Sequence, residues 1–93
     1  MFKKDACVKS QYGIHARPSA AIAKEAMDNF PHTDITIIDP DINQQGDARS
    51  VLELMMMALV CGKVVTVCAI GEDEEKAVDA IVTIIETFEV DDR

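Results

Sequence analysis

The segment Gly-Ile-His-Ala-Arg-Pro, residues 13–18, marks the point at which the chain changes from a strand pattern to a helix pattern. Before it, residues 2–8 alternate between apolar and polar positions, which predicts a half-buried strand. After it, apolar residues recur every three or four positions, as on one face of a helix. The predicted buried stripe consists of Ala16, Ala20, Ala23, Met27 and Phe30. Proline is tolerated only in a first helical turn, so Pro18 predicts that the helix begins within a residue or two of His15.

The remaining elements follow from the same kinds of pattern. Residues 34–38 are typical of a strand, and residues 39–46 form a polar turn that leaves room for a short strand after it. A second helix is expected from Ser50 to Gly62, because Ser50 and Glu53 fit a capping box at its start. Residues 63–70 predict another strand. The last helix is expected to start in the acidic run 72–75, and the tail at 90–93 is expected to fray. Its predicted buried stripe is Val78, Ile81, Ile85 and Phe88.

This order of elements is typical of an α+β open-faced β-sandwich, in which the helices cover one face of a sheet. With 93 residues, of which 48% are hydrophobic, the chain is expected to form a single domain over residues 1–93. A formal net charge of −8 argues against nucleic acid and anionic membranes as partners, because phosphate binding needs clustered Lys and Arg. No apolar run approaches the roughly 20 residues that span a bilayer, and no signal peptide is evident, so a cytoplasmic protein is expected.

Neither the cysteines nor the acidic residues predict a metal site. The cysteines are Cys7, Cys61 and Cys68. They are widely spaced among apolar neighbours, which predicts small buried hydrophobic side chains and no disulfide. Residues 39–43 begin like a calcium loop, but Gln44 stands where such a loop requires glycine. We therefore expect no metal and no cofactor, and we expect His32 to be a solvated surface residue.

His15 is the strongest candidate for a chemically active residue. A side chain at the start of a helix lies beside backbone N–H groups that lack helical partners, and these groups bind anions together with the helix dipole. Arg17 can add a charge-assisted clamp on phosphate oxygens. A neutral imidazole is also a competent nucleophile. The segment therefore permits His15 to accept a phosphoryl group, although an isolated histidine near a helix start is more often an ordinary surface residue.

The segment 13–18 resembles the Gly-Leu-His-Ala-Arg-Pro signature of the HPr family, with Ile14 in place of the usual leucine. Three later stretches are similar to the same family: Lys-Glu-Ala at 24–26, Ser-Val-Leu at 50–52 and Gly-Glu-Asp-Glu at 71–74. The resemblance therefore spans almost the whole chain. It implies a four-stranded antiparallel sheet with three helices on one face, in the order βαββαβα.

The resemblance also implies a function, that of a phosphocarrier of the phosphoenolpyruvate-dependent sugar phosphotransferase system. In that role enzyme I phosphorylates His15 on Nδ1, Arg17 is the charge partner, and the phosphate passes to enzyme IIA domains. Such a protein acts as a monomer, and no independent turnover is expected of it. Ser50 matches the serine that HPr kinase/phosphorylase modifies in many members. The residues implied in partner binding are Lys24, Val51, Leu52 and Met55.

Two departures from the family pattern concern the partners. Met27 and Glu53 stand where many members carry lysine or a neutral residue, so docking is expected to depend on apolar contacts, Arg17 and Lys24. This difference leaves open a regulatory HPr-like protein, of the nitrogen type or another, that uses phosphorylation as a signal without sugar transport. A structural module built on the apolar second helix is a third reading. Met56 and Met57 fit core filling as well as docking.

Overall fold

The structure is a computed structural model that describes residues 1–10 and 13–88. The strands in these residues are β1 (Phe2–Cys7), β2 (Thr33–Asp39), β3 (Gln44–Asp47) and β4 (Val64–Gly71). The helices in the same residues are α1 (Ala16–Asn29), α2 (Val51–Met56) and α3 (Glu74–Thr87). The order is the predicted βαββαβα. The expected fraying at 90–93 lies outside the described residues.

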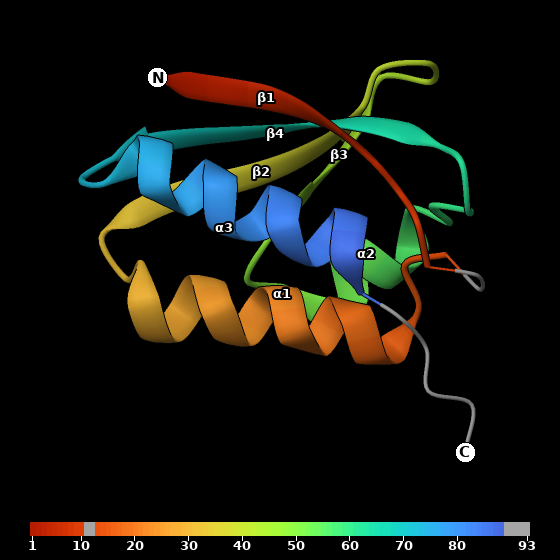
Figure 1. The fold of residues 1–93 in the computed structure, drawn as a ribbon, viewed down its shortest axis with the longest axis horizontal. Coiled ribbons are helices and arrows are strands. Elements are labelled where there is room, and N and C mark those ends of the chain that lie inside the picture. The colour runs from red at the N-terminus through yellow and green to blue at the C-terminus, as the bar shows by residue number, and fades with distance from the viewer. Residues whose placement is uncertain (11–12, 89–93) are drawn as a thin grey trace.

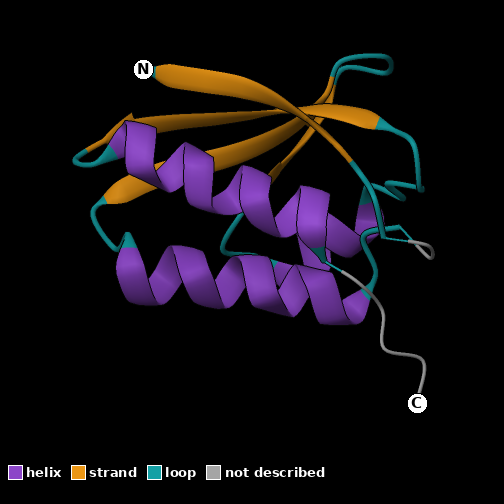
Figure 2. Cartoon of the chain, viewed as in Figure 1, coloured by secondary structure: helices purple, strands orange, loops and turns teal. Residues whose placement is uncertain are grey.

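The strands form one sheet in the order β1-β4-β2-β3, and every neighbouring pair is antiparallel. The long strand β4 lies between β1 and β2, with Lys3 and Thr36 both opposite Cys68. All three described helices lie on the same side of this sheet (Figure 1), and the other side carries no helix of the described chain (Figure 2). The predicted α+β open-faced sandwich is therefore confirmed.

The hydrophobic core fills the space between the sheet and the helices. Along β4, Val65, Val67 and Ala69 are buried, whereas Val64 and Ile70 are exposed on the open face. This alternation is the period of two that a strand with one covered face requires. On α3 the buried residues are Ala77, Val78, Ile81, Val82 and Ile85. The predicted stripe of this helix is thus confirmed, except that Phe88 lies beyond the helix end and is only half-buried.

The predicted buried stripe of α1 is wrong. The helix buries Pro18, Ser19, Ile22, Ala23 and Ala26. From the predicted stripe only Ala23 is fully buried and Phe30 partly so, while Ala16, Ala20 and Met27 are exposed. The physical reason is that alanine gains little from burial on either face, whereas Ile22 removes far more apolar area from water. The orientation of the helix therefore follows Ile22, and an apolar stripe remains on its outer face.

The second helix is shorter than predicted, because it ends at Met56 and the chain turns at Ala58. Ala58 has φ +54°, a left-handed conformation that costs a residue with a Cβ atom about 1–2 kcal/mol. The turn buries Met57 and Leu59 but leaves Met56 exposed. Of the two methionines whose role was open, Met57 therefore fills the core and Met56 does not.

We expect Ala58→Gly to stabilise the protein. Glycine adopts a positive φ without steric cost, and this gain exceeds its larger entropy loss, so the free energy of unfolding should rise by about 0.5–1 kcal/mol. Thermal unfolding followed by circular dichroism would measure the change. Ala20→Gly is the matched control, because the same substitution on the exposed face of α1 should lower stability by about 1 kcal/mol. A fall in the melting temperature of Ala58→Gly would contradict the strain assigned to Ala58.

The acidic turn after β2 holds a lysine. The Nζ atom of Lys63 lies 3.1 Å from Oδ1 of the buried Asp39 and 2.9 Å from Oδ2 of Asp41. The hydrogen bonds to Asp41 and Asp39 raise the pKa of Lys63 above its usual value. The ammonium group of Lys63 thus pairs with two of the carboxylates in the segment that resembles a calcium loop. The described residues contain no cluster of three or more potential metal ligands.

The cysteines are less buried than predicted. Cys61 is exposed, and Cys7 and Cys68 are half-buried. The prediction failed for Cys61 because the second helix does not reach it, so the residue lies in the turn between α2 and β4. All three thiols are free. His32 is exposed, as predicted. Within the described residues, none of the helices has the length and hydrophobicity that crossing a membrane requires.

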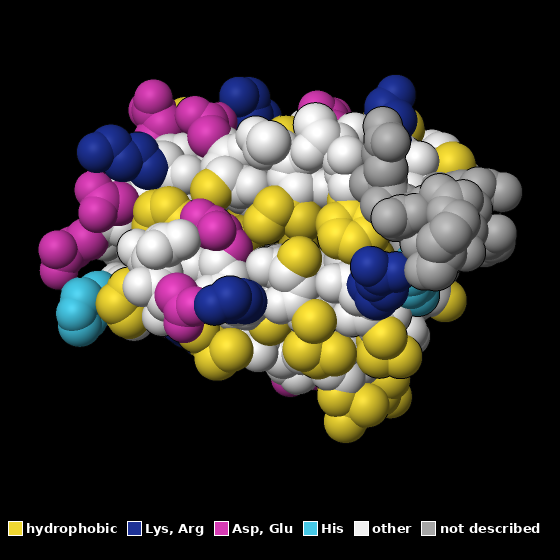
Figure 3. Space-filling view, turned by 60° about the horizontal axis from the view of Figure 1, so that its bottom comes forward, with side chains coloured by type: hydrophobic (Ala, Val, Ile, Leu, Met, Phe, Trp, Pro, Cys, Tyr) yellow, Lys and Arg dark blue, Asp and Glu magenta, His cyan; other side chains and the backbone are white. Residues whose placement is uncertain are grey.

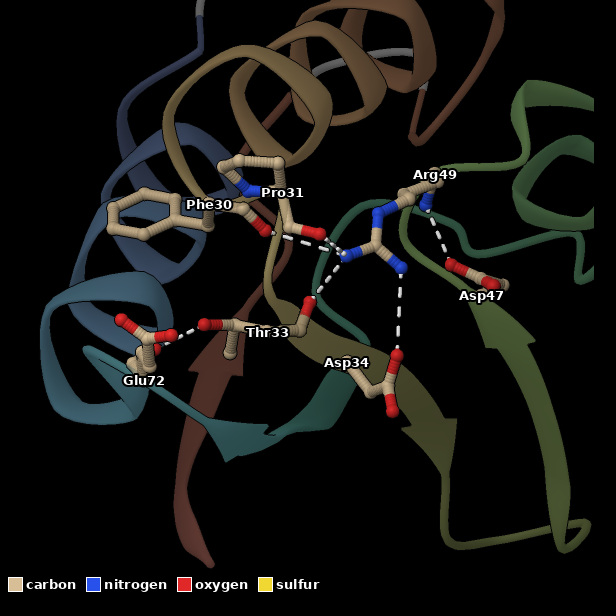
Figure 4. A network of polar contacts seen from close by, with 7 residues as sticks. All are labelled: Phe30, Pro31, Thr33, Asp34, Asp47, Arg49 and Glu72. Carbon is tan, nitrogen blue, oxygen red and sulfur yellow. Dashed lines mark hydrogen bonds and ion pairs between the residues drawn. The ribbon is translucent and has the colours of Figure 1, made fainter.

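Arg49 joins the end of α1 to the segment before α2 (Figure 4). Its Nη2 donates to the carbonyl oxygens of Phe30, Pro31 and Thr33 at 3.3, 3.2 and 2.6 Å. Its Nη1 lies 3.5 Å from Oδ1 of Asp34. Thr33 in turn donates its hydroxyl to the carbonyl of Glu72, so the start of β2 is bound from both sides. A single guanidinium therefore fixes the connection between α1 and β2.

Arg49→Met should lower the free energy of unfolding by about 2 kcal/mol, because it removes the guanidinium donor from three carbonyl oxygens while keeping much of the apolar stem. Of these three, the Phe30 carbonyl still accepts the N–H of Thr33. Chemical denaturation would measure the loss. The stability of Arg49→Lys should lie between that of Arg49→Met and that of the wild type, since one ammonium cannot reproduce the geometry of the guanidinium. Equal stability of Arg49→Met and the wild type would show that water replaces these bonds without cost.

Candidate functional site

His15 is the N-cap residue of α1 and lies between the loop after β1 and the first helical turn. Its backbone is extended, with φ −105° and ψ −159°, and its side chain makes no capping hydrogen bond to the helix. The helix begins one residue after His15, as predicted. The His15 side chain is half-buried, and its Nε2 atom is buried.

The loop is fixed to the turn that follows α2. The N–H of Ile14 donates to the carbonyl of Leu59 at 2.7 Å, and the N–H of Gly13 donates to the carbonyl of Ser10 at 2.9 Å. Gly13 has φ +73°, and a Cβ atom added there would lie 2.2 Å from the Leu59 oxygen. Only glycine fits so close to that carbonyl. Gly13 thus positions the loop that carries His15 through a contact that is distant in sequence.

The first turn of α1 provides donors for an anion. Ala16 and Arg17 are its first residues, and N–H groups at these positions have no partner within a helix. Pro18 has no N–H to satisfy and is buried, which suits a proline in a first turn. The next N–H, that of Ser19, donates to the carbonyl of His15 at 3.0 Å. The donors of the first two residues and the helix dipole together favour an anionic group beside His15.

Two cations were predicted to act at this site, and they differ in the structure. Arg17 is exposed and takes part in no ion pair among residues 1–10 and 13–88. Lys24 is also exposed, but its Nζ lies 2.7 Å from Oδ2 of Asp28 one turn further along the helix. The hydrogen bond to Asp28 raises the pKa of Lys24. Arg17 is therefore available to a phosphate, whereas much of the charge of Lys24 is compensated within its own helix.

The structure places Ser50 as the N-cap of α2, as predicted. Its Oγ accepts the N–H of Glu53 at 3.2 Å. The reciprocal half of the capping box is not formed, because Oε1 of Glu53 accepts the N–H of Asp47 at 2.9 Å. The hydroxyl of Ser50 is thus half-buried and has a structural role before any modification.

The predicted partner-binding residues of α2 lie on the outside of the helix. Leu52 and Met55 are 69% and 44% exposed, while Val51 is half-buried. Hydrophobic side chains gather along one edge of this side of the molecule, close to a histidine and to Lys and Arg side chains (Figure 3). Helices α1 and α2 pack against each other. The structure thus brings the apolar surface and the helix that begins after His15 together.

Two residues that hold the segments before and after α1 in place, Leu59 and Arg49, were not predicted from the sequence. Leu59 supports the loop through a backbone carbonyl, which carries no signal in its side chain. Arg49 fixes the connection between α1 and β2, and the local signal for it is an arginine directly before a cap residue in a strongly acidic chain.

The fold and the site together define a class of small open-faced β-sandwich proteins that present a histidine at the anion-binding start of a helix. Residues 2–87 match the family model for the phosphotransferase-system HPr component phosphorylation site. The chain therefore belongs to the HPr family.

The chain is similar to phosphocarrier proteins of other bacteria over most of their length. The chain is 35% identical over 89 residues to the phosphocarrier protein HPr of Haemophilus influenzae, covering 96% of this chain and 100% of the relative. It is 39% identical over 81 residues to that of Mycoplasma capricolum, covering 87% and 86%. The crystal structure of HPr from Bacillus anthracis has a TM-score of 0.82 at 28% identity, covering 91% of this chain and 96% of that one.

Proposed function

We propose that this protein is a phosphocarrier of the phosphoenolpyruvate-dependent sugar phosphotransferase system. In this role it accepts a phosphoryl group on His15 from enzyme I and passes it to enzyme IIA domains. The function rests on the family membership and on one geometric observation, the position of His15 beside the donors of the first turn of α1. The donor phosphoenolpyruvate is made in the cytoplasm, so the transfer is proposed to occur there.

Nδ1 is the proposed nucleophile. The Nε2 atom of His15 is buried while the residue as a whole is half-buried, so we assign the attack to the other ring nitrogen. The Nδ1 lone pair attacks phosphorus, a P–N bond forms, and the bond from phosphorus to the donor breaks. The N–H groups of the first turn and the guanidinium of Arg17 stabilise the phosphoryl oxygens. Because the site stands at the surface, the group can leave again to the next acceptor.

The docking surface is proposed to comprise Val51, Leu52 and Met55 of α2, with Lys24 at its margin. Apolar side chains exposed in one patch mark contact surfaces more often than isolated ones do. The protein is proposed to act as a single domain and a monomer. We propose no cofactor, because the imidazole itself is the nucleophile that accepts the phosphoryl group.

The first experiment follows label from phosphoenolpyruvate. Purified protein is incubated with labelled phosphoenolpyruvate and enzyme I, and the HPr of Haemophilus influenzae serves as the positive control. We expect acid-labile, base-stable label on the protein, as for a phosphohistidine, and its transfer on addition of an enzyme IIA. Label that never moves onward would favour the regulatory alternative. No label on this protein beside a labelled control would contradict both.

Ser50 is proposed as a second modification site, for HPr kinase/phosphorylase. Its position at a helix N-terminus favours a phosphate, but the carboxylate of Glu53 follows one turn later and opposes it. Intact-mass measurement after treatment with the kinase and ATP tests the proposal, with Ser50→Ala as the control. Addition of a phosphate to both proteins, or to neither, would exclude Ser50.

A further inference from the structure

An apolar strip crosses both helices that flank the site. On α1 it consists of the exposed Ala16, Ala20 and Met27, and on α2 and the turn after it of Leu52, Met55, Met56 and Val60. Met27, Leu52 and Met56 are 50%, 69% and 68% exposed. The three positions on α1 are the part of the predicted buried stripe that the structure leaves exposed. The strip is thus wider than the patch on α2 alone.

The charges on these two helices nearly cancel. Helices α1 and α2 carry two cationic residues and three acidic ones, a net charge of −1. The cations are Arg17 and Lys24, and the acids are Glu25, Asp28 and Glu53. Because Lys24 is paired with Asp28, Arg17 is the cation of these helices that no described carboxylate compensates. The acidic excess lies elsewhere in the chain, because the overall net charge of −8 leaves −7 outside these two helices.

We infer that the surface of enzyme I recognised by this protein is apolar and poor in charge, and that Met27 and Met56 determine this specificity. The inference rests on the proposed function and extends it. A strongly acidic partner would gain attraction only from Arg17 and would meet Glu53 and the acidic net charge with repulsion. An apolar partner surface instead removes Met27, Leu52 and Met56 from water, and flexible methionine side chains adapt their shape to such a surface.

The test compares Met27→Lys with Ile70→Lys in phosphoryl transfer from enzyme I of the same host. Both changes add a cation in place of an exposed apolar residue, but Ile70 lies on the open face of the sheet, away from the helices. We expect the KM of enzyme I for Met27→Lys to rise about tenfold, and that for Ile70→Lys to stay within about twofold of the wild type. For the wild type, salt between about 0.05 and 0.5 M should change the KM by less than about twofold, because little charge is screened.

Three results would overturn the inference. A lower KM for Met27→Lys would reveal an acidic partner surface, and so would a steep rise of the wild-type KM with salt. In both cases His15 is still labelled, so the proposed function survives. Absence of label on the wild type would instead remove the proposed function and this inference with it.

Discussion

His15→Ala should abolish phosphoryl transfer, with a loss of about a thousandfold or more, because no other group at the site offers a nucleophilic nitrogen. The backbone donors of α1 and Arg17 remain in the variant and still attract phosphoryl oxygens, but they provide no nucleophile to accept the phosphorus. The side chain of His15 makes no capping hydrogen bond, so the helix is expected to form without it. Label from phosphoenolpyruvate, counted on the purified protein, is the measurement, and circular dichroism confirms the fold.

The matched control is His32→Ala. The chain contains two histidines, and His32 is exposed in the turn after α1, at the other end of that helix from His15. The variant should accept label at the wild-type rate. If label persisted on His15→Ala and disappeared from His32→Ala, the phosphorylated residue would be His32, and the proposed mechanism would be wrong.

Among substitutions near the site that add a single methyl group, we expect Gly13→Ala to lower stability and phosphoryl transfer the most. The new Cβ would lie 2.2 Å from the carbonyl oxygen of Leu59, which accepts the N–H of Ile14 at 2.7 Å. The loop must move to relieve this contact, and the hydrogen bond is then lost. Together with the positive φ of Gly13, the free energy of unfolding should fall by about 3 kcal/mol. Because the same loop carries His15, kcat/KM for phosphoryl transfer should fall at least about tenfold.

Gly62→Ala separates the two causes. Gly62 also has a positive φ, of +91°, but a Cβ atom there would meet nothing within 4 Å. This variant should lose only about 1–2 kcal/mol through the left-handed backbone and should keep the transfer rate. Denaturation curves and transfer kinetics of both variants give the comparison. If the two variants lose the same stability and the same activity, the contact with Leu59 does not position His15.

Much of the fold was readable from local pattern. The alternation in residues 2–8, the position of Pro18 and the cap at Ser50 each depend on neighbours within a few positions, and each was confirmed. The position of His15 directly before α1 was also readable, because the motif around it is contiguous. These features are local because strand alternation, helix entry and capping are decided by backbone geometry over four or five residues.

The errors arose where several parts of the chain compete for one surface. The face that α1 buries was predicted from spacing alone, and spacing cannot rank alanine against Ile22. The early end of α2 at Met56 depends on how Met57 and Leu59 enter the core. Arg49 binds the carbonyl of Thr33, and Asp39 pairs with Lys63. These partners lie far away in the sequence, and no local pattern relates them.

The sequence by itself determined the order of elements, the family and the histidine at the start of α1, because these depend on near neighbours or on contiguous motifs. Only the tertiary structure decided which side of α1 faces the sheet, and hence that Ala16, Ala20 and Met27 form an outer apolar strip. It alone placed the Leu59 carbonyl against Gly13. The reason is that burial and close backbone approach are set by contacts between segments far apart in the chain, and such contacts are chosen only when the whole core packs.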